Sequence, residues 1–303
     1  MQKVSFIVLI GITLVCVKPV AQQPLSANAQ EVSLLHRKVV VAAGTGLALG
    51  ITTYGLSQAW YNEYDKVNFH WFDDSQQWLQ MDKAGHFLSS YHFGMGGYNA
   101  FKWAGFSENT SLWIGGNTGF LLLLGVEYLD GKSSGWGASI SDLASNTAGS
   151  LLFIGQEKIW HEQRITPKFS YRQSPYASKN PGLLGDGLQE EWLKDYNGQT
   201  YWLSFNIKSF INSNHIPAWL DLSLGYGGDG LMRGSLADQN SSEFANIQRL
   251  RQYYFSLDAD LWRIPTQSKW LKTSFRVLSF VKIPFPGVRI DSKGGLKMEW
   301  LSF

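Results

Sequence analysis

The chain has 303 residues, of which 17% are charged and 15% aromatic, and its formal net charge is +2. The charged fraction lies below the roughly 25% that is usual for soluble domains, and such a composition suits a protein at a membrane or a membrane surface. A small net charge without a run of Lys and Arg excludes the electrostatic footprint of nucleic-acid binding. We therefore expect no nucleic-acid partner.

The first residues, MQKVSFIVLIGITLVCVKPVAQQ, contain a lysine near the start, an apolar run and then a polar stretch of small residues. This order is typical of a secretory signal peptide, which we place in residues 1–29 with cleavage after Ala21 or Ala29. Cys16, the only cysteine, would leave with it, and the mature chain would then have no disulfide and no thiolate metal site. A lipoprotein anchored through Cys16 is the alternative, although Val15 is bulkier than the residue that usually precedes such a cysteine.

Residues 30–161 are expected to form an up-and-down bundle of about four helices, at 39–59, 82–103, 111–128 and from Ser139 or Ser141 to 160. The first of these stretches is uncharged and long enough to cross a bilayer. Small residues recur at intervals of four in the first and third helices, and this spacing favours close helix packing. These small residues are Ala42, Gly46, Gly50, Gly115 and Gly119.

Proline and glycine punctuate residues 162–199, which indicates a linker with at most one short helix near residues 188–193. After this segment, apolar residues alternate with polar ones at 201–207, 220–226 and 253–261, and this period of two predicts strands. The stretch DSKGG at 291–295 predicts a closing hairpin, whereas residues 270–281 have a helical pattern. We expect about five strands in residues 200–303.

These elements together predict an α+β protein: a helical bundle at 30–161, a linker at 162–199, and a small antiparallel β-rich region at 200–303 with one apolar face. Tryptophan and tyrosine side chains of this last region are candidates for interfacial anchors, which would make a membrane or envelope lipid the expected partner. Ordinary core aromatics are the alternative.

A set of polar residues interrupts the apolar helices. Three belong to the start of the second helix, two to the end of the third and two to the first turns of the fourth: Asp82, Lys83, His86, Glu127, Asp130, Asp142 and Asn146. Because consecutive helices joined by short loops run antiparallel, these three helix ends share one side of the bundle. The sequence therefore predicts a single polar cluster there, without assigning a role to any member.

Helix capping and core hydrogen bonding are the alternatives for much of this set. Asp82 fits a plain N-cap, and Ser139 followed by Asp142 resembles a capping box. Glu127 and Asp130 resist this explanation, because a carboxylate at a helix C-terminus opposes the helix dipole by about 0.3–1 kcal/mol. A positive charge is therefore expected beside them, from Lys83, protonated His86 or a metal ion.

The motifs DKAGHF at 82–87, EYLDG at 127–131 and SISDLASNTAG at 139–149 resemble the YfiM-type family of periplasmic lipoproteins, whose function is unknown. More distantly, their order is similar to that of VanZ-like membrane proteins, which are associated with glycopeptide resistance. The resemblance implies a location in the bacterial envelope. It carries over six motif positions without roles: Asp82, Lys83, His86, Glu127, Asp142 and Asn146.

Three functions of different kinds remain open. The first is a non-enzymatic envelope protein, in which the cluster fixes the helices and the tail docks on a membrane or partner. The alternative is a metal-dependent hydrolase or transferase that acts on an envelope lipid or cell-wall substrate, in which His86 and the carboxylates bind zinc or manganese or share acid and base roles. A third possibility is a component that binds or transports a small ligand between the helices. We expect export to the periplasm or the outer membrane, with the inner membrane as the alternative.

Overall fold

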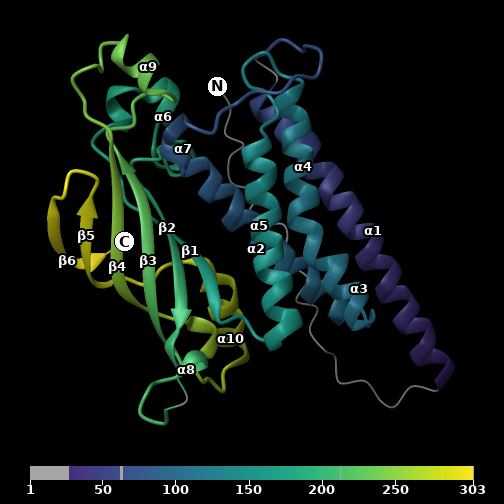
Figure 1. The fold of residues 1–303 in the computed structure, drawn as a ribbon. Coiled ribbons are helices and arrows are strands. Elements are labelled where there is room, and N and C mark those ends of the chain that lie inside the picture. Colours follow the sequence, from purple (N-terminus) through teal and green to yellow (C-terminus); the bar gives the residue numbers. More distant parts are fainter. Residues whose placement is uncertain (1–26, 62–63, 212, 303) are drawn as a thin grey trace. The chain divides into compact units, whose positions relative to one another are not determined.

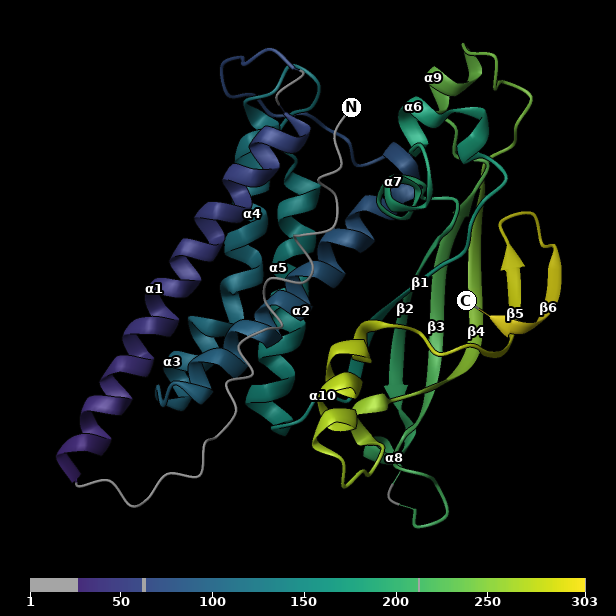
Figure 2. The same ribbon diagram turned by 180° about the vertical axis from the view of Figure 1, so that it is seen from behind.

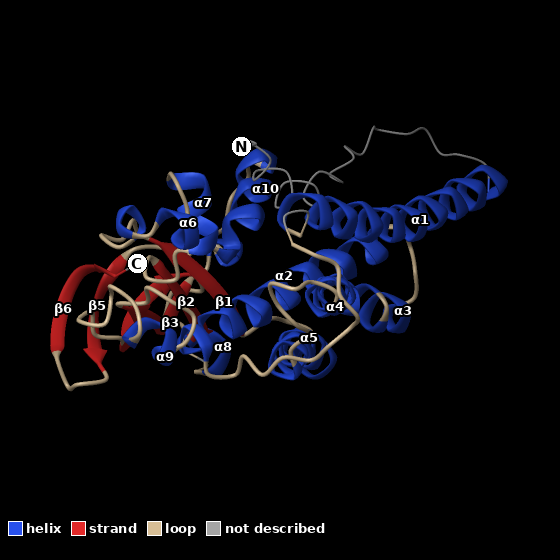
Figure 3. Cartoon of the chain, turned by 90° about the horizontal axis from the view of Figure 1, so that it is seen from above, coloured by secondary structure: helices blue, strands red, loops and turns tan. Residues whose placement is uncertain are grey.

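The computed structural model describes residues 27–61, 64–211 and 213–302, and the proposed signal sequence with Cys16 falls largely outside these ranges. The chain divides into two compact units. The helical unit comprises the residues up to Asp74 together with Ser89–His161, and the sheet unit comprises Ser75–Leu88 and the residues from Glu162 onward. Helices in the first half and an antiparallel sheet in the second confirm the predicted α+β class (Figure 3).

The long helices of the first half are α1 (Ala27–Trp60), α2 (Met81–Trp103), α4 (Thr118–Gly131) and α5 (Ile140–Trp160) (Figure 1). The second and fourth predicted helices correspond to α2 and α5. Helix α5 begins where the sequence predicts it, because Ser139 is its N-cap and the Ser139 hydroxyl accepts the Asp142 amide at 3.1 Å.

The third predicted helix, at 111–128, is not continuous. It consists of α3 (Glu108–Trp113), a short 3-10 helix at Gly115–Asn117, and α4. The Thr118 hydroxyl donates to the carbonyl oxygens of Gly115 and Phe93, at 2.8 and 2.9 Å, and so satisfies backbone groups at the break. The expectation of one helix was wrong because apolar periodicity continues through the paired glycines.

Within the described residues, two stretches are long and apolar enough to cross a membrane, Glu31–Gln58 and Glu108–Gly131. In an apolar segment of 18 residues, 6% is buried in the first stretch and 39% in the second. Length and composition alone are weak evidence for a span, since signal sequences and core helices share them.

The glycines that recur at intervals of four have different surroundings in the two predicted helices. A Cβ at Gly119 would clash with the backbone of Ser90 in α2, and one at Gly115 would lie against the backbone of Gly97. In α1, by contrast, a Cβ at Gly46 or Gly50 would have no atom within 4 Å. The predicted close approach therefore occurs at Gly115 and Gly119, and it does not occur at Gly46 and Gly50 of α1.

Replacing Gly119 by alanine is expected to lower the free energy of unfolding by about 1–3 kcal/mol, the usual range for an overpacked site. A matched control is Gly155→Ala in α5, where a new Cβ meets nothing within 4 Å and where alanine should raise helix stability by about 0.5–1 kcal/mol. Urea unfolding followed by circular dichroism measures both changes. Equal effects of the two substitutions would contradict close packing at Gly119.

The sheet has six antiparallel strands in sequential order: β1 (Ile165–Tyr171), β2 (Gln199–Asn206), β3 (Leu220–Asp229), β4 (Leu250–Ala259), β5 (Phe285–Asp291) and β6 (Leu296–Ser302). Five of these, β2 to β6, correspond to the region in which about five strands are predicted. The expected hairpin joins β5 to β6, and α10 (Lys269–Val277) occupies most of the segment with the helical pattern. The short helices α8 (Ile207–Phe210) and α9 (Leu236–Asn240) lie in connecting loops.

The segment at 162–199 contains more structure than the expected linker. Beside the short helix α7 (Leu188–Lys194), which matches the expectation, it holds β1 and α6 (Pro181–Leu184). Strand β1 pairs with β2 along its whole length, and the Lys282 amide donates to the Phe169 carbonyl oxygen at 2.9 Å. Proline at position 167 is tolerated because β1 lies at the end of the strand order.

Candidate functional site

The junction between α4 and α5 brings two of the candidate residues close to one another. Glu127 is in the last turns of α4 and Asp142 in the first turn of α5, and both side chains are buried. The Glu127 Oε2 atom accepts the backbone amide of Ser139, the N-cap of α5, at 2.8 Å. The end of one helix is thus hydrogen-bonded to the beginning of the next.

Asp74 adds a third carboxylate to this junction. Its Oδ1 atom accepts the hydroxyls of Ser139 and Ser141, at 2.6 and 3.0 Å. Asp74 is not among the site residues predicted from the sequence. The only available signal was the pair of acids at 73–74 shortly before the second predicted helix, which also fits an exposed loop.

Asp130 and Asn146 lie further along the same two helices. The Tyr61 hydroxyl donates to Asp130 Oδ1 at 2.7 Å, and burial, reinforced by the charge of Asp130, raises the pKa of Tyr61. Asn146 is fully buried one turn after Asp142, and its backbone carbonyl accepts the Ser90 hydroxyl at 2.6 Å. This contact places α2 beside α5 within the helical unit.

The environment of Glu127 disfavours its ionised form. Burial is the main cause, and the negative charges of Asp142, Asp130 and Asp74 add to it. The hydrogen bond from the Ser139 amide acts in the opposite direction, and the pKa of Glu127 is raised to about 8. In this setting the Glu127 carboxyl is largely protonated at neutral pH.

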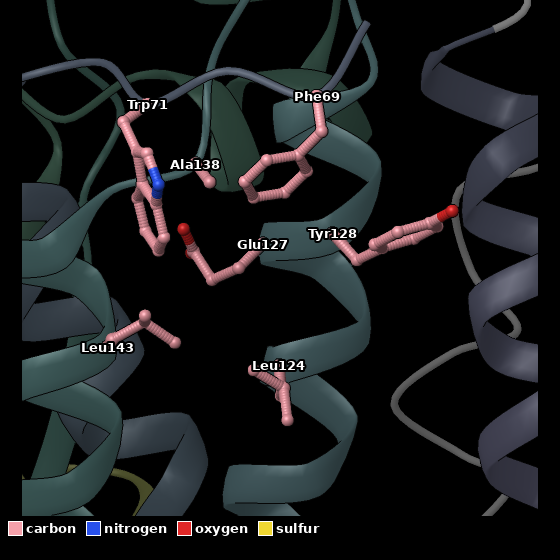
Figure 4. Close-up of a pocket in the computed structure, with 7 residues that line it drawn as sticks. All are labelled: Phe69, Trp71, Leu124, Glu127, Tyr128, Ala138 and Leu143. Atoms are coloured by element: carbon pink, nitrogen blue, oxygen red, sulfur yellow. The ribbon is translucent and has the colours of Figure 1, made fainter.

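Glu127 also lines a cavity of about 200 Å³ in the helical unit. The other lining residues are apolar or aromatic: Phe69, Trp71, Leu124, Tyr128, Ala138 and Leu143. Figure 4 shows the Glu127 carboxyl projecting from α4 among these side chains, on the side of Trp71 and Ala138. The apolar lining explains why loss of solvation dominates the pKa shift.

Asp82, Lys83 and His86 belong to the first turns of α2, which are part of the sheet unit. Asp82 follows the first residue of the helix, inside its first turn, so the plain N-cap interpretation was wrong. The Lys83 ammonium lies 2.8 Å from Asp82 Oδ2, and both side chains are mostly buried. That these three residues join the carboxylates of α4 and α5 in one cluster stays a prediction.

A second charged cluster, in the sheet unit, has no counterpart in the sequence analysis. Lys168 Nζ lies 2.8 Å from Asp258 Oδ2 and 3.7 Å from Asp221 Oδ2, and Lys282 Nζ lies 3.9 Å from Asp258 Oδ1. All four side chains are at most 2% exposed. The Ser204 hydroxyl donates a further hydrogen bond to Asp258 at 2.8 Å.

Burial perturbs two members of this second cluster. It lowers the pKa of Lys282 to about 8, against the opposing attraction of Asp258, and it raises the pKa of Asp221 to about 6, against that of Lys168. The signal that could have revealed the cluster is the polar half of each alternating strand, such as Ser204 with Asn206 and Asp221 with Ser223. A polar residue at every second position is equally typical of a solvent-facing side.

Comparison with known proteins gives one match. No curated protein and no solved structure is significantly similar to this chain. Residues 69–154, which include all seven predicted cluster residues, match the model of the family described as "Predicted periplasmic lipoprotein (DUF2279)". Over that stretch the chain is similar to a family of unknown activity, and the similarity supports an exported, periplasmic protein.

Proposed function

We propose that the chain is a non-enzymatic protein of the bacterial cell envelope, in which the carboxyl cluster of the helical unit holds α4 and α5 together. One observation carries this proposal: the hydrogen bonds of Glu127 and Asp74 go to the N-terminal turn of α5. They are accepted from a backbone amide and two serine hydroxyls. Such contacts satisfy the free N–H groups and hydroxyls of a helix start.

The charge balance of the cluster supports the same role. A buried carboxylate is costly unless it is fully paired, whereas a protonated carboxyl can accept and donate hydrogen bonds without that cost. The raised pKa of Glu127 favours the protonated form at neutral pH. A buried polar network of this kind favours one register of the helices over others.

For the location, we favour the periplasm or the periplasmic side of the outer membrane. The similarity to periplasmic lipoproteins supports export. Arg37 and Lys38 precede the uncharged part of α1, and after signal cleavage this places positive charge on the outer side of an inner-membrane span, against the usual rule. The inner membrane is therefore the less favoured location.

Metal-dependent hydrolysis or group transfer is the second candidate function. A carboxyl with a pKa near neutrality is suited to general acid or base catalysis, and such shifts occur often at active sites. Glu127 and Asp142 would supply oxygen ligands, and His86, if the predicted cluster forms, a nitrogen ligand suited to zinc or manganese. The sequence contains no HExxH motif. Its GxSxG match, GKSSG at 131–135, follows helix α4 and not a strand, so it lacks the strand–turn–helix context of a nucleophile elbow.

Metal content separates the two functions. Element analysis of the purified protein, of Glu127→Gln and of Asp142→Asn is expected to find no stoichiometric transition metal in any of them. The exposed acid Glu108 provides a control as Glu108→Gln. One equivalent of zinc or manganese in the wild-type protein and the control, lost in the two cluster variants, would favour the enzyme instead.

Removing the cap of α5 tests the structural role itself. Ser139→Ala is expected to lower the free energy of unfolding by about 1–2 kcal/mol, because it deletes both the N-cap and a hydroxyl that donates to Asp74. In combination with Asp74→Asn the loss should be less than additive, since the two side chains share one hydrogen bond. The exposed Ser134 provides the control as Ser134→Ala. Additive losses would show that the two residues act independently.

A further inference from the structure

The sheet unit exposes an apolar surface that its own strands define. The register aligns Leu203 of β2 with Leu224, Leu224 with Phe255, Phe255 with Val288, and Val288 with Met298, so that one apolar row crosses five strands. Neighbouring rows on the same side extend it. We call the exposed part of this side the outer face, and it comprises Leu224, Tyr253, Phe255, Leu257, Ile290, Leu296, Met298 and Trp300.

Every residue of the outer face is at least 40% exposed, and Trp300 is 78% exposed. In β3 and β4, several of the side chains that alternate with them are polar and buried, among them Ser223, Ser256 and Asp258. This is the reverse of a sheet in water, which buries its apolar side and exposes its polar side. A shift of the strand register by one residue would not give an ordinary sheet with a buried apolar side. It would expose the buried Lys168–Asp258 pair.

The helix α10 provides an independent indication of the partner. It is amphipathic: Lys269, Lys272 and Arg276 lie on one side, while Trp270 and Val277 are exposed on another. No acidic residue occurs in the helix. Basic amphipathic helices with tryptophan bind in the interface of membranes that contain anionic lipids.

The position of α10 in the sheet unit fits the same partner. The chain leaves β4 at Ala259, passes through a 3-10 helix at Leu261–Arg263 with the exposed Trp262, and then forms α10. The helix thus lies near the end of the sheet at which β4 ends (Figure 2). The segment after α10 crosses the buried side of the sheet, where Lys282 lies over the ring of Trp202, so α10 borders the outer face only at the end of the strands. Tryptophan and basic residues at one end of an apolar surface are typical of the boundary between acyl chains and headgroups.

We propose that the outer face lies against the acyl chains of a phospholipid bilayer, with α10 in the layer of anionic headgroups. The basic charge of α10 favours a surface of anionic lipids as the partner. The outer face is also a continuous apolar patch. Apolar residues that are exposed singly are normal on a protein surface and need no explanation. This proposal goes beyond the function proposed for the helical unit and does not depend on it.

The test needs a local probe, because the exposed apolar helix α1 could bind vesicles by itself. Since Cys16 is the only cysteine, the full chain with Cys16→Ser accepts a single new label. A nitrobenzoxadiazole label on Phe255→Cys is compared with one on Leu236→Cys, an exposed leucine of α9 in the same sheet unit. The protein is reconstituted into vesicles of phosphatidylethanolamine and phosphatidylglycerol with or without a doxyl-labelled acyl chain.

We expect the label at position 255 to lose most of its emission in doxyl-containing vesicles and to shift to the blue, while the label at 236 changes little. A label on Val277→Cys should also be quenched, and less so when phosphatidylglycerol is replaced by phosphatidylcholine. Circular dichroism verifies that each labelled protein is folded. Equal quenching at 255 and 236, or none at 255, would overturn the proposal. Cross-linking between two copies through position 255, without quenching, would assign the face to a second copy instead.

Discussion

Replacing Asp258 by alanine is expected to lower the free energy of unfolding by about 3–5 kcal/mol, the range measured when one partner of a buried ion pair is removed. Asp258 is fully buried and lies within 4 Å of two buried ammonium groups, those of Lys168 and Lys282. Without it, Asp221 is the remaining carboxylate beside Lys168, at 3.7 Å. Urea unfolding at pH 7, followed by circular dichroism, measures the loss.

Two further variants separate the charge from the volume of the side chain. Asp258→Asn keeps the shape and should still lose most of this stability, whereas Lys282→Met in the Asp258→Asn background should recover part of it by removing an unpaired buried charge. The exposed Asp186 serves as control, and Asp186→Asn should change stability by less than about 0.5 kcal/mol. A small effect of Asp258→Ala would mean that water reaches the two lysines.

The periodicity of the sequence was sufficient to predict most of the helices and strands. Apolar spacing located α2 and α5, and the period of two located β2, β3 and β4, because each buries or exposes one complete side. The DSKGG turn located the hairpin of β5 and β6. Periodicity failed at β1, where proline, lysine and serine lie among the apolar residues, so the segment looked like a loop. Pairing with β2 supplies the stability that the local sequence does not indicate.

Contacts between charged residues were harder to predict from the sequence. Helix order was enough to suggest that Glu127 and Asp142 approach one another, since a short connection joins α4 to α5. The meeting of Lys168 with Asp258 depends instead on the register of four strands and on the side of the sheet that is buried. The period of two gives the alternation of the sides, but not which of them faces inward. The sequence predicted one apolar side of the sheet without assigning it to the interior, and in β3 and β4 much of the buried side is polar.

The second large expected effect is a dependence of the free energy of unfolding on pH, which tests the raised pKa of Glu127. In the unfolded chain this carboxyl titrates near 4.5, and in the folded protein its pKa is about 8. Below pH 4.5 it is neutral in both states, so folding carries no penalty from it. As the pH rises to about 8 the unfolded state ionises first, and stability falls by an amount on the order of 4 kcal/mol.

Glu127→Gln should remove this fall, because the amide keeps an oxygen that can accept the Ser139 N–H and carries no titrating proton. The difference between the two unfolding curves from pH 5 to 8 isolates Glu127, since Asp221 and Lys282 titrate equally in both proteins. Glu243→Gln, at an exposed position, should leave the wild-type slope unchanged. A bound divalent cation would reverse the sign: it would hold Glu127 ionised, wild-type stability would rise with pH, and Glu127→Gln would be the less stable protein at pH 8. The direction of this one slope therefore distinguishes a protonated structural carboxyl from a metal ligand.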